Sequence, residues 1–142
     1  MVLDDLPTTL ADLIVWGEAP SRNPYMAGFF KRKRSAARGN QITLREFTER
    51  YGRPFFTSSV LRRLSGIMGI SRLTFSRCGS VPPAIYLDRM YVGNGVNPGV
   101  DDLLPVEWLG AVETYPRNAA PFELGLQDRP GTCGSIYLWT ER

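Results

Sequence analysis

The spacing of apolar residues changes from helical to strand-like after Gly69, and this change most constrains how the chain folds. Before it, Thr43-Leu44-Arg45-Glu46 has the pattern of a capping box, in which the threonine and the glutamate satisfy free backbone N–H groups reciprocally. We predict a first helix that starts at Thr43 and stops at Gly52, and a second helix over Ser58–Ser65.

Short apolar or alternating runs bounded by glycine and proline follow Gly69, and they are typical of strands. The predicted strands are Leu73–Arg77, Ala84–Asp88, Met90–Val92, Ala111–Tyr115 and Ser135–Thr140, with an earlier edge strand at Leu13–Trp16 and a short helical turn near Pro105. Residues 18–40 read as a long loop with one helical turn around Tyr25–Arg34. We therefore expect an α+β fold, with a small mixed sheet of four to five strands and two short helices packed on it.

The two cysteines, Cys78 and Cys133, each lie beside a glycine at the edge of a predicted strand. If both strands belong to one sheet, a bond between them closes a long loop and adds about 4 kcal/mol in the chain-entropy description. The other reading is two buried free thiols in a cytosolic protein. A redox pair is less favoured, because the chain has no Cys-x-x-Cys spacing.

Histidine is absent from the chain, which excludes the commonest general base, the commonest metal ligand and any Ser-His-Asp arrangement. Two cysteines cannot supply a four-ligand zinc site. Asp101-Asp102 and Glu107 could serve acid/base chemistry or bind calcium, but acids before a short helix more often complement its dipole. Asp88 reads as a turn residue. We expect no enzyme, no metal and no cofactor.

A basic run, Lys31-Arg32-Lys33-Arg34, carries much of the net charge of +3 and lies near the aromatic residues Tyr25, Phe29 and Phe30. These four cations, Lys31, Arg32, Lys33 and Arg34, are the candidate interaction surface. Basic residues interleaved with aromatics can bind nucleic acid, but a solvated face with its aromatics in the core is more common. We therefore expect no nucleic acid as a partner.

No apolar run approaches the roughly 20 residues of a membrane-spanning helix. The first residues, Met1–Asp5, are acidic where a secretory signal is basic, and no apolar region of signal length follows. The expectation is a cytosolic chain, or a chain whose natural start lies further upstream.

Five segments in order resemble the plug domain of TonB-dependent outer-membrane receptors, and most closely the short plug-like proteins without a barrel. The family has, in order, an opening helix, a "vLrrLpGv" segment, an "iylDG" strand, an "ip..diesIEVyrG" segment and a closing "cGvIviwT" strand. The similar segments of this chain, in the same order, are Ile42–Phe47, Ser59–Ile67, Ala84–Asp88, Leu104–Tyr115 and Cys133–Thr140. Two departures alter turns: Arg89 replaces a glycine, and Pro116-Arg117-Asn118 replaces Arg-Gly-Pro.

The resemblance implies a division into a strand and basic linker over residues 1–41 and a plug-like domain over residues 42–142. It also implies the bacterial envelope, periplasmic or associated with the outer membrane, and this oxidising location favours the Cys78–Cys133 disulfide. The partner implied is an envelope protein, such as an outer-membrane barrel or a TonB-like protein.

The expected function is a non-enzymatic plug-like binding or interaction module, related to TonB-dependent transport systems. Because no barrel sequence follows within the 142 residues, transport itself is not expected. The alternative is a cytosolic basic adaptor that binds nucleic acid or anionic lipid through residues 29–38.

Overall fold

A five-stranded sheet forms the centre of the protein in a computed structural model that describes residues 23–35, 38–69, 72–125 and 128–141. Its strands are β1 (Asn40–Thr43), β4 (Ala84–Leu87), β5 (Met90–Gly93), β6 (Leu109–Tyr115) and β7 (Ser135–Thr140). They lie in the order β1-β6-β7-β4-β5, and only the β4–β7 pair is parallel. A second sheet pairs β2 (Ile67–Met68) with β3 (Thr74–Phe75).

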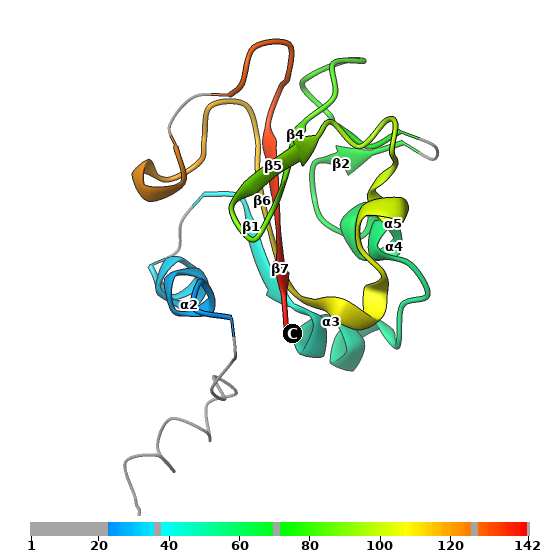
Figure 1. The fold of residues 1–142 in the computed structure, drawn as a ribbon, viewed down its shortest axis with the longest axis vertical. Helices are drawn as coiled ribbons and strands as arrows, with labels where there is room; N and C mark the ends of the chain where they lie inside the picture. Colours follow the sequence, from blue (N-terminus) through cyan, green and yellow to red (C-terminus); the bar gives the residue numbers. More distant parts are fainter. Residues whose placement is uncertain (1–22, 36–37, 70–71, 126–127, 142) are drawn as a thin grey trace, which may run out of the picture.

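Helices cover both faces of the large sheet (Figure 1). Helix α2 (Met26–Arg34) lies on one face, and α4 (Thr57–Arg62) and α5 (Val100–Leu103) lie on the other, with α3 (Leu44–Tyr51) at the end of β1. Two 3-10 turns, η1 (Val106–Trp108) and η2 (Phe122–Leu124), flank β6. The predicted α+β fold with a mixed sheet is confirmed, and the described residues contain four short α-helices where two were expected.

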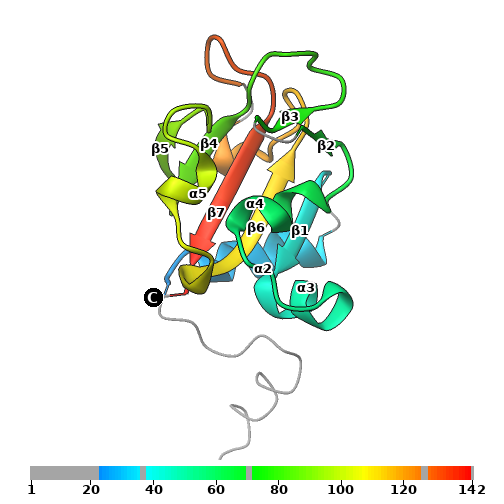
Figure 2. The same cartoon turned by 90° about the vertical axis from the view of Figure 1, so that its right-hand side faces the viewer.

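The main core lies between the sheet and the helices α4 and α5, which stand in front of it in Figure 2. It is made of aliphatic side chains and Phe47 and Phe75, together with both cysteines; its fully buried members include Val60, Leu61, Ile85, Leu104, Val112, Ile136 and Leu138. Burial of such side chains provides about 1.5–3 kcal/mol each and is the main force that holds α4 on the sheet.

The opposite face of the sheet carries a row of aromatic and polar side chains that share one register across all five strands. The row runs through Gln41, Glu113, Tyr137, Tyr86 and Tyr91. The rings of Tyr86 and Tyr137 stack with their centres 4.6 Å apart. This face of the sheet therefore carries polar side chains that need hydrogen-bond partners, in addition to apolar side chains that pack against α2.

The capping box predicted at Thr43 is confirmed, and it explains where α3 begins. The Thr43 Oγ1 accepts a hydrogen bond from the Glu46 backbone N–H, and the Glu46 carboxylate accepts one from the Thr43 N–H, each at 3.0 Å. Gly52 ends the helix at a φ of 90°, a conformation that glycine adopts without a side-chain clash.

Two predicted elements have other bounds in the structure. The single helical turn expected within the loop of residues 18–40 is a helix of nine residues, because Met26, Phe29 and Arg32 are buried on one side of it against the sheet. The strand predicted over Leu73–Arg77 is only Thr74–Phe75, since the chain turns at Cys78, whose N–H donates to the Phe75 carbonyl.

Two further strands escaped prediction. β1 has a single buried apolar side chain, Ile42, so it lacks a visible strand pattern, and β2 is only two residues long. The boundary expected between residues 41 and 42 falls inside β1. The edge strand predicted at Leu13–Trp16 lies outside the described residues. Within the described ranges, no helix has the length and apolar character needed to cross a membrane.

The turn between β4 and β5 has two residues with positive φ, Asp88 at 48° and Arg89 at 72°. This is the pattern of a type I′ hairpin turn, in which glycine is favoured at the second position. Arg89 therefore adopts a left-handed conformation that disfavours a side chain, although its Nη2 donates a 2.8 Å hydrogen bond to the Glu123 carbonyl.

We predict that Arg89→Gly is more stable than Arg89→Ala by about 1 kcal/mol, because both lose the guanidinium and only glycine relieves the left-handed strain. Urea unfolding of both variants measures the difference. Equal stabilities would contradict the assignment of this turn.

Candidate functional site

The Cys78–Cys133 disulfide is present, with its Cα atoms 5.8 Å apart. It joins the turn after β3 to a position two residues before β7, so it connects the small sheet to the large one rather than two strands of one sheet. The Cys133 N–H also donates to the Pro82 carbonyl at 2.9 Å. The bond thus holds the second sheet over the end of the first.

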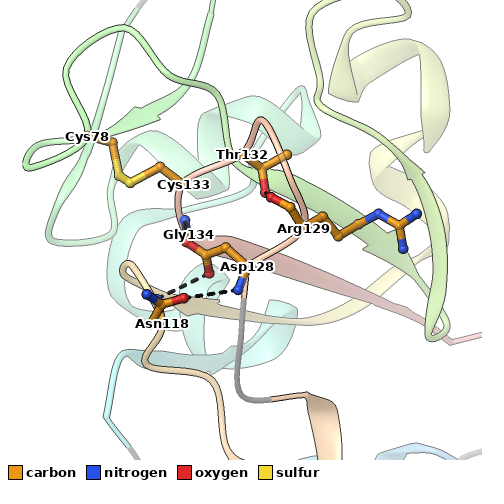
Figure 3. Close-up of a disulfide and its surroundings, with 7 residues drawn as sticks. All are labelled: Cys78, Asn118, Asp128, Arg129, Thr132, Cys133 and Gly134. Atoms are coloured by element: carbon orange, nitrogen blue, oxygen red, sulfur yellow. Dashed lines mark hydrogen bonds between the residues drawn. A yellow bond between two sulfur atoms is a disulfide. The ribbon is translucent and has the colours of Figure 1, made fainter.

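A network of hydrogen bonds holds the loop that leads to Cys133 (Figure 3). Asn118 and Asp128 bond each other reciprocally, each backbone N–H donating to the other's side chain at 3.2 and 3.0 Å. The second oxygen of Asp128 accepts from the Gly134 N–H at 2.7 Å. These contacts fix the chain on both sides of the disulfide.

Gly134 explains why a glycine follows Cys133. Its φ is +86°, and a Cβ built there would lie 2.2 Å from the ring of Phe75. The ring of Phe75, which lies in β3, therefore packs directly on the backbone of Gly134. The disulfide and the contact of the Phe75 ring with Gly134 together hold the small sheet against the start of β7.

A buried carboxylate, Glu113, lies at the centre of the opposite face of the sheet, with no exposed surface. Arg32 on α2 donates to both of its oxygens, from Nε at 2.7 Å and from Nη2 at 2.6 Å. Tyr115 donates its hydroxyl to Oε1, and Trp139 donates its indole N–H to Oε2 at 2.7 Å. All four acceptor positions of the carboxylate are therefore occupied.

The electrostatics of this cluster favour a fixed ion pair. Burial alone lowers the pKa of Arg32, but the hydrogen bond and charge of Glu113 outweigh it, so the net shift is upward. Burial, and then the charge of Glu113, raise the pKa of the Tyr115 hydroxyl. The tyrosine therefore stays protonated and donates to the carboxylate. A carboxylate saturated in this way attaches α2 to the sheet and has no lone pair left for a substrate proton.

The structure divides the predicted basic run. Arg32 is buried in the ion pair with Glu113, and Lys33 is half-buried, with its Nζ 2.9 Å from Glu46. Lys31 and Arg34 are exposed on α2. The four cations therefore do not share one surface. The signal for the missed partner was Glu113 itself, a charged residue between apolar neighbours in the predicted strand Ala111–Tyr115.

Two of the carboxylates singled out in the sequence, Asp101 and Asp88, accept structural hydrogen bonds. Asp101 accepts from the Ser58 N–H at 2.8 Å and from its hydroxyl at 2.6 Å, so it caps α4 from the neighbouring helix α5. Asp88 accepts from the Thr140 N–H and hydroxyl, at 3.0 and 2.7 Å, and from the Asn23 amide. These contacts account for the positions of both acids in the fold.

An open groove of about 860 Å³ lies between α2, α3 and η1. Apolar side chains line it, with charged ones among them: Met26, Phe30, Leu44, Pro54, Phe55, Val106 and Leu109 are joined by Arg45, Arg53, Glu49, Glu107 and Glu141. Phe55 is 85% exposed, and its neighbour Phe56 is 58% exposed. The sequence analysis did not identify this groove, because its residues come from four separate segments.

Comparison with known proteins finds no matching family model, no similar curated protein and no matching solved structure. The resemblance to plug domains therefore stays a prediction. In the part of the chain that the structure describes, no cluster of three or more histidine, cysteine or acidic residues could hold a metal ion.

We predict that Glu113→Gln lowers the free energy of unfolding by about 3–5 kcal/mol, because it leaves the buried Arg32 charge with only the half-exposed Glu123 carboxylate, 3.7 Å away, as a counterion. Arg32→Met should lower the free energy of unfolding by a similar amount, because it leaves the Glu113 carboxylate buried without its cation. The double variant Arg32→Met/Glu113→Gln leaves no lone charge, so its cost should be clearly less than the sum of the two single costs. Urea unfolding of the four proteins measures the coupling, and additive costs would contradict a direct pair.

A second prediction concerns acid stability. Burial tends to raise the pKa of Glu46, but hydrogen bonds from Thr43 and Lys33 lower it below its ordinary value of 4.5. A lowered folded-state pKa stabilises the fold above the unfolded-state value, and this contribution is lost as pH falls through the folded-state value. Glu46→Gln should therefore reduce the loss of stability between about pH 5 and pH 3.

Unfolding curves across this pH range measure the effect. Lys33→Met is the matched variant, because it removes one cause of the lowered pKa and keeps the carboxylate; its pH dependence should lie between those of the wild type and Glu46→Gln. If the stability of Glu46→Gln fell with pH as steeply as that of the wild type, the prediction would be contradicted.

Proposed function

We propose that this protein is a non-enzymatic, plug-like binding module of the bacterial envelope that binds a protein partner through the groove between α2, α3 and η1. The single observation that carries the proposal is the exposure of Phe55 in that groove, with 85% of its surface in water. A large aromatic side chain left in water within an apolar groove is typical of a surface that a partner covers.

The composition of the groove favours a protein segment as its occupant. Its apolar side chains are joined by two exposed arginines, Arg45 and Arg53, and by the exposed acids Glu49, Glu107 and Glu141. An apolar centre with a charged rim of both signs is the usual arrangement of a protein–protein interface. An outer-membrane barrel or a TonB-like protein is the class of partner proposed, in keeping with the resemblance of residues 42–140 to plug domains.

The disulfide supports the location. Structural disulfides persist in oxidising compartments such as the periplasm and are rare in the cytosol. The Cys78–Cys133 bond joins the two sheets where Phe75 also packs on Gly134, so it has a structural role in this fold. The mixed α+β fold also agrees with what the resemblance implies.

Photo-crosslinking in cells of the native organism tests the proposal. A photoreactive residue introduced as Phe55→p-benzoylphenylalanine should give one discrete adduct with an envelope protein. Phe122→p-benzoylphenylalanine is the matched control, because Phe122 is 80% exposed but does not line the groove. No adduct at position 55, or the same adduct from both positions, would count against the groove as the binding surface.

Cell fractionation with thiol labelling tests the location separately. The protein is expected in the periplasmic or outer-membrane fraction, with both cysteines blocked until a reductant is added. Cytosolic protein with two free thiols would overturn the proposed envelope location.

A further inference from the structure

A second cavity, of about 620 Å³, is lined by residues next to the start of β1, the end of β6 and the small sheet. Figure 2 shows these backbone segments at one end of the large sheet. Three arginines from three separate segments line it: Arg38 before β1, Arg77 after β3 and Arg117 after β6. The other lining residues are Gly39, Asn40, Ser65, Gly66, Phe75, Ser76, Cys78 and Pro116, so no carboxylate borders the cavity within the described residues.

The three arginines differ from the other cations that the structure holds in place. Arg32 and Lys33 are paired with Glu113 and Glu46. Among the residues that the structure describes, neither Arg38, Arg77 nor Arg117 has a carboxylate within ion-pair distance. Three like charges bordering one cavity raise its positive potential, and a concave surface focuses that potential further.

The backbone around the cavity is fixed, so the three arginines are brought together by the fold. Asn40 pairs with Thr114 in the β1–β6 register, which places Arg38 and Arg117 at the same end of the two strands. Gly39 passes so close to β6 that a Cβ there would lie 2.1 Å from the Thr114 carbonyl oxygen. The backbones of Gly39 and β6 are therefore too close for a residue with a side chain at position 39.

Arg77 is positioned by the neighbouring disulfide. It directly precedes Cys78, which lines the cavity and is bonded to Cys133. The Ser76 N–H donates to the Gly66 carbonyl at 2.8 Å, which closes the small sheet along the rim. The disulfide thus fixes the backbone next to Arg77 at the edge of the cavity.

We infer that this three-arginine cavity binds a phosphate group. A guanidinium group offers a planar fork of N–H donors that matches phosphate oxygens, and several such forks around one anion are typical of phosphate recognition. The volume exceeds that of a free phosphate ion, and Phe75 and Pro116 supply an apolar wall, which suits a phosphate carried on an organic body. This site is distinct from the groove between α2, α3 and η1, and the inference does not depend on the proposed function.

Titration calorimetry with the full chain tests the inference, with glycerol 3-phosphate and inorganic phosphate as soluble probes. Vesicles of phosphatidylcholine with and without phosphatidic acid, followed by co-sedimentation, test a lipid-borne phosphate. Saturable binding in either arm is expected, and the arm in which it occurs identifies the source of the phosphate.

The decisive variant is Arg38→Gln/Arg77→Gln/Arg117→Gln, which should weaken binding at least about tenfold by removing charged hydrogen bonds. Lys31→Gln/Arg50→Gln/Arg72→Gln is the matched control, because it removes the same charge from exposed cations that line neither this cavity nor the groove between α2, α3 and η1. It should keep affinity within about twofold, the size of a general charge effect at moderate salt.

Three results would overturn the inference. These are no saturable binding in either arm, equal weakening in the two triple variants, or unchanged affinity in Arg38→Gln/Arg77→Gln/Arg117→Gln. Thermal unfolding of both triple variants confirms that each is folded, and all three arginines are exposed, so their loss leaves the core intact.

Discussion

The ion pair between Arg32 and Glu113 is the interaction on which one whole side of this protein depends. A carboxylate with no exposed surface lies at the centre of the sheet, and its charge requires a counterion and hydrogen-bond donors. Arg32 supplies the charge, and Tyr115 and Trp139 supply the remaining donors. Because Arg32 belongs to α2, the requirement of one buried anion brings that helix onto the sheet and places one residue of the basic run in the interior.

The other face of the sheet, which carries α4 and α5, is stabilised by apolar burial rather than by an ion pair. There α4 and α5 are held by aliphatic burial. The small β2–β3 sheet is held by Ile67, Leu73 and Phe75, which are buried in the same core, and by the Cys78–Cys133 disulfide. Because a sheet of two short strands is only marginally stable by itself, a covalent bond is an effective additional means of fixing it. The two surfaces proposed for binding lie where these parts meet: the groove beside α2 and α3, and the three-arginine cavity beside the disulfide.

Local signals in the sequence predicted those elements whose causes are themselves local. The capping box at Thr43 begins α3, and the strands around Ala84–Leu87 and Ser135–Thr140 follow from apolar runs between turn residues. β1 could not be predicted in this way, because its pairing with β6 rather than its own composition makes it a strand. The nine-residue α2 was predicted as one turn for the same reason, since its burial depends on Glu113, 81 residues away from Arg32.

The sequence by itself determined the α+β class, the mixed sheet and the pair of cysteines, because hydrophobic spacing and turn chemistry act over a few neighbouring residues. The sequence also has four cations in one run as a candidate interaction surface. Only the tertiary structure decided which of these cations are exposed and which are buried. The fold turned Arg32 and Lys33 inward to meet Glu113 and Glu46, and it gathered three other arginines around a cavity. The physical reason is that a charge is placed by its distant partners, and those partners are set by strand register and helix packing rather than by sequence neighbours.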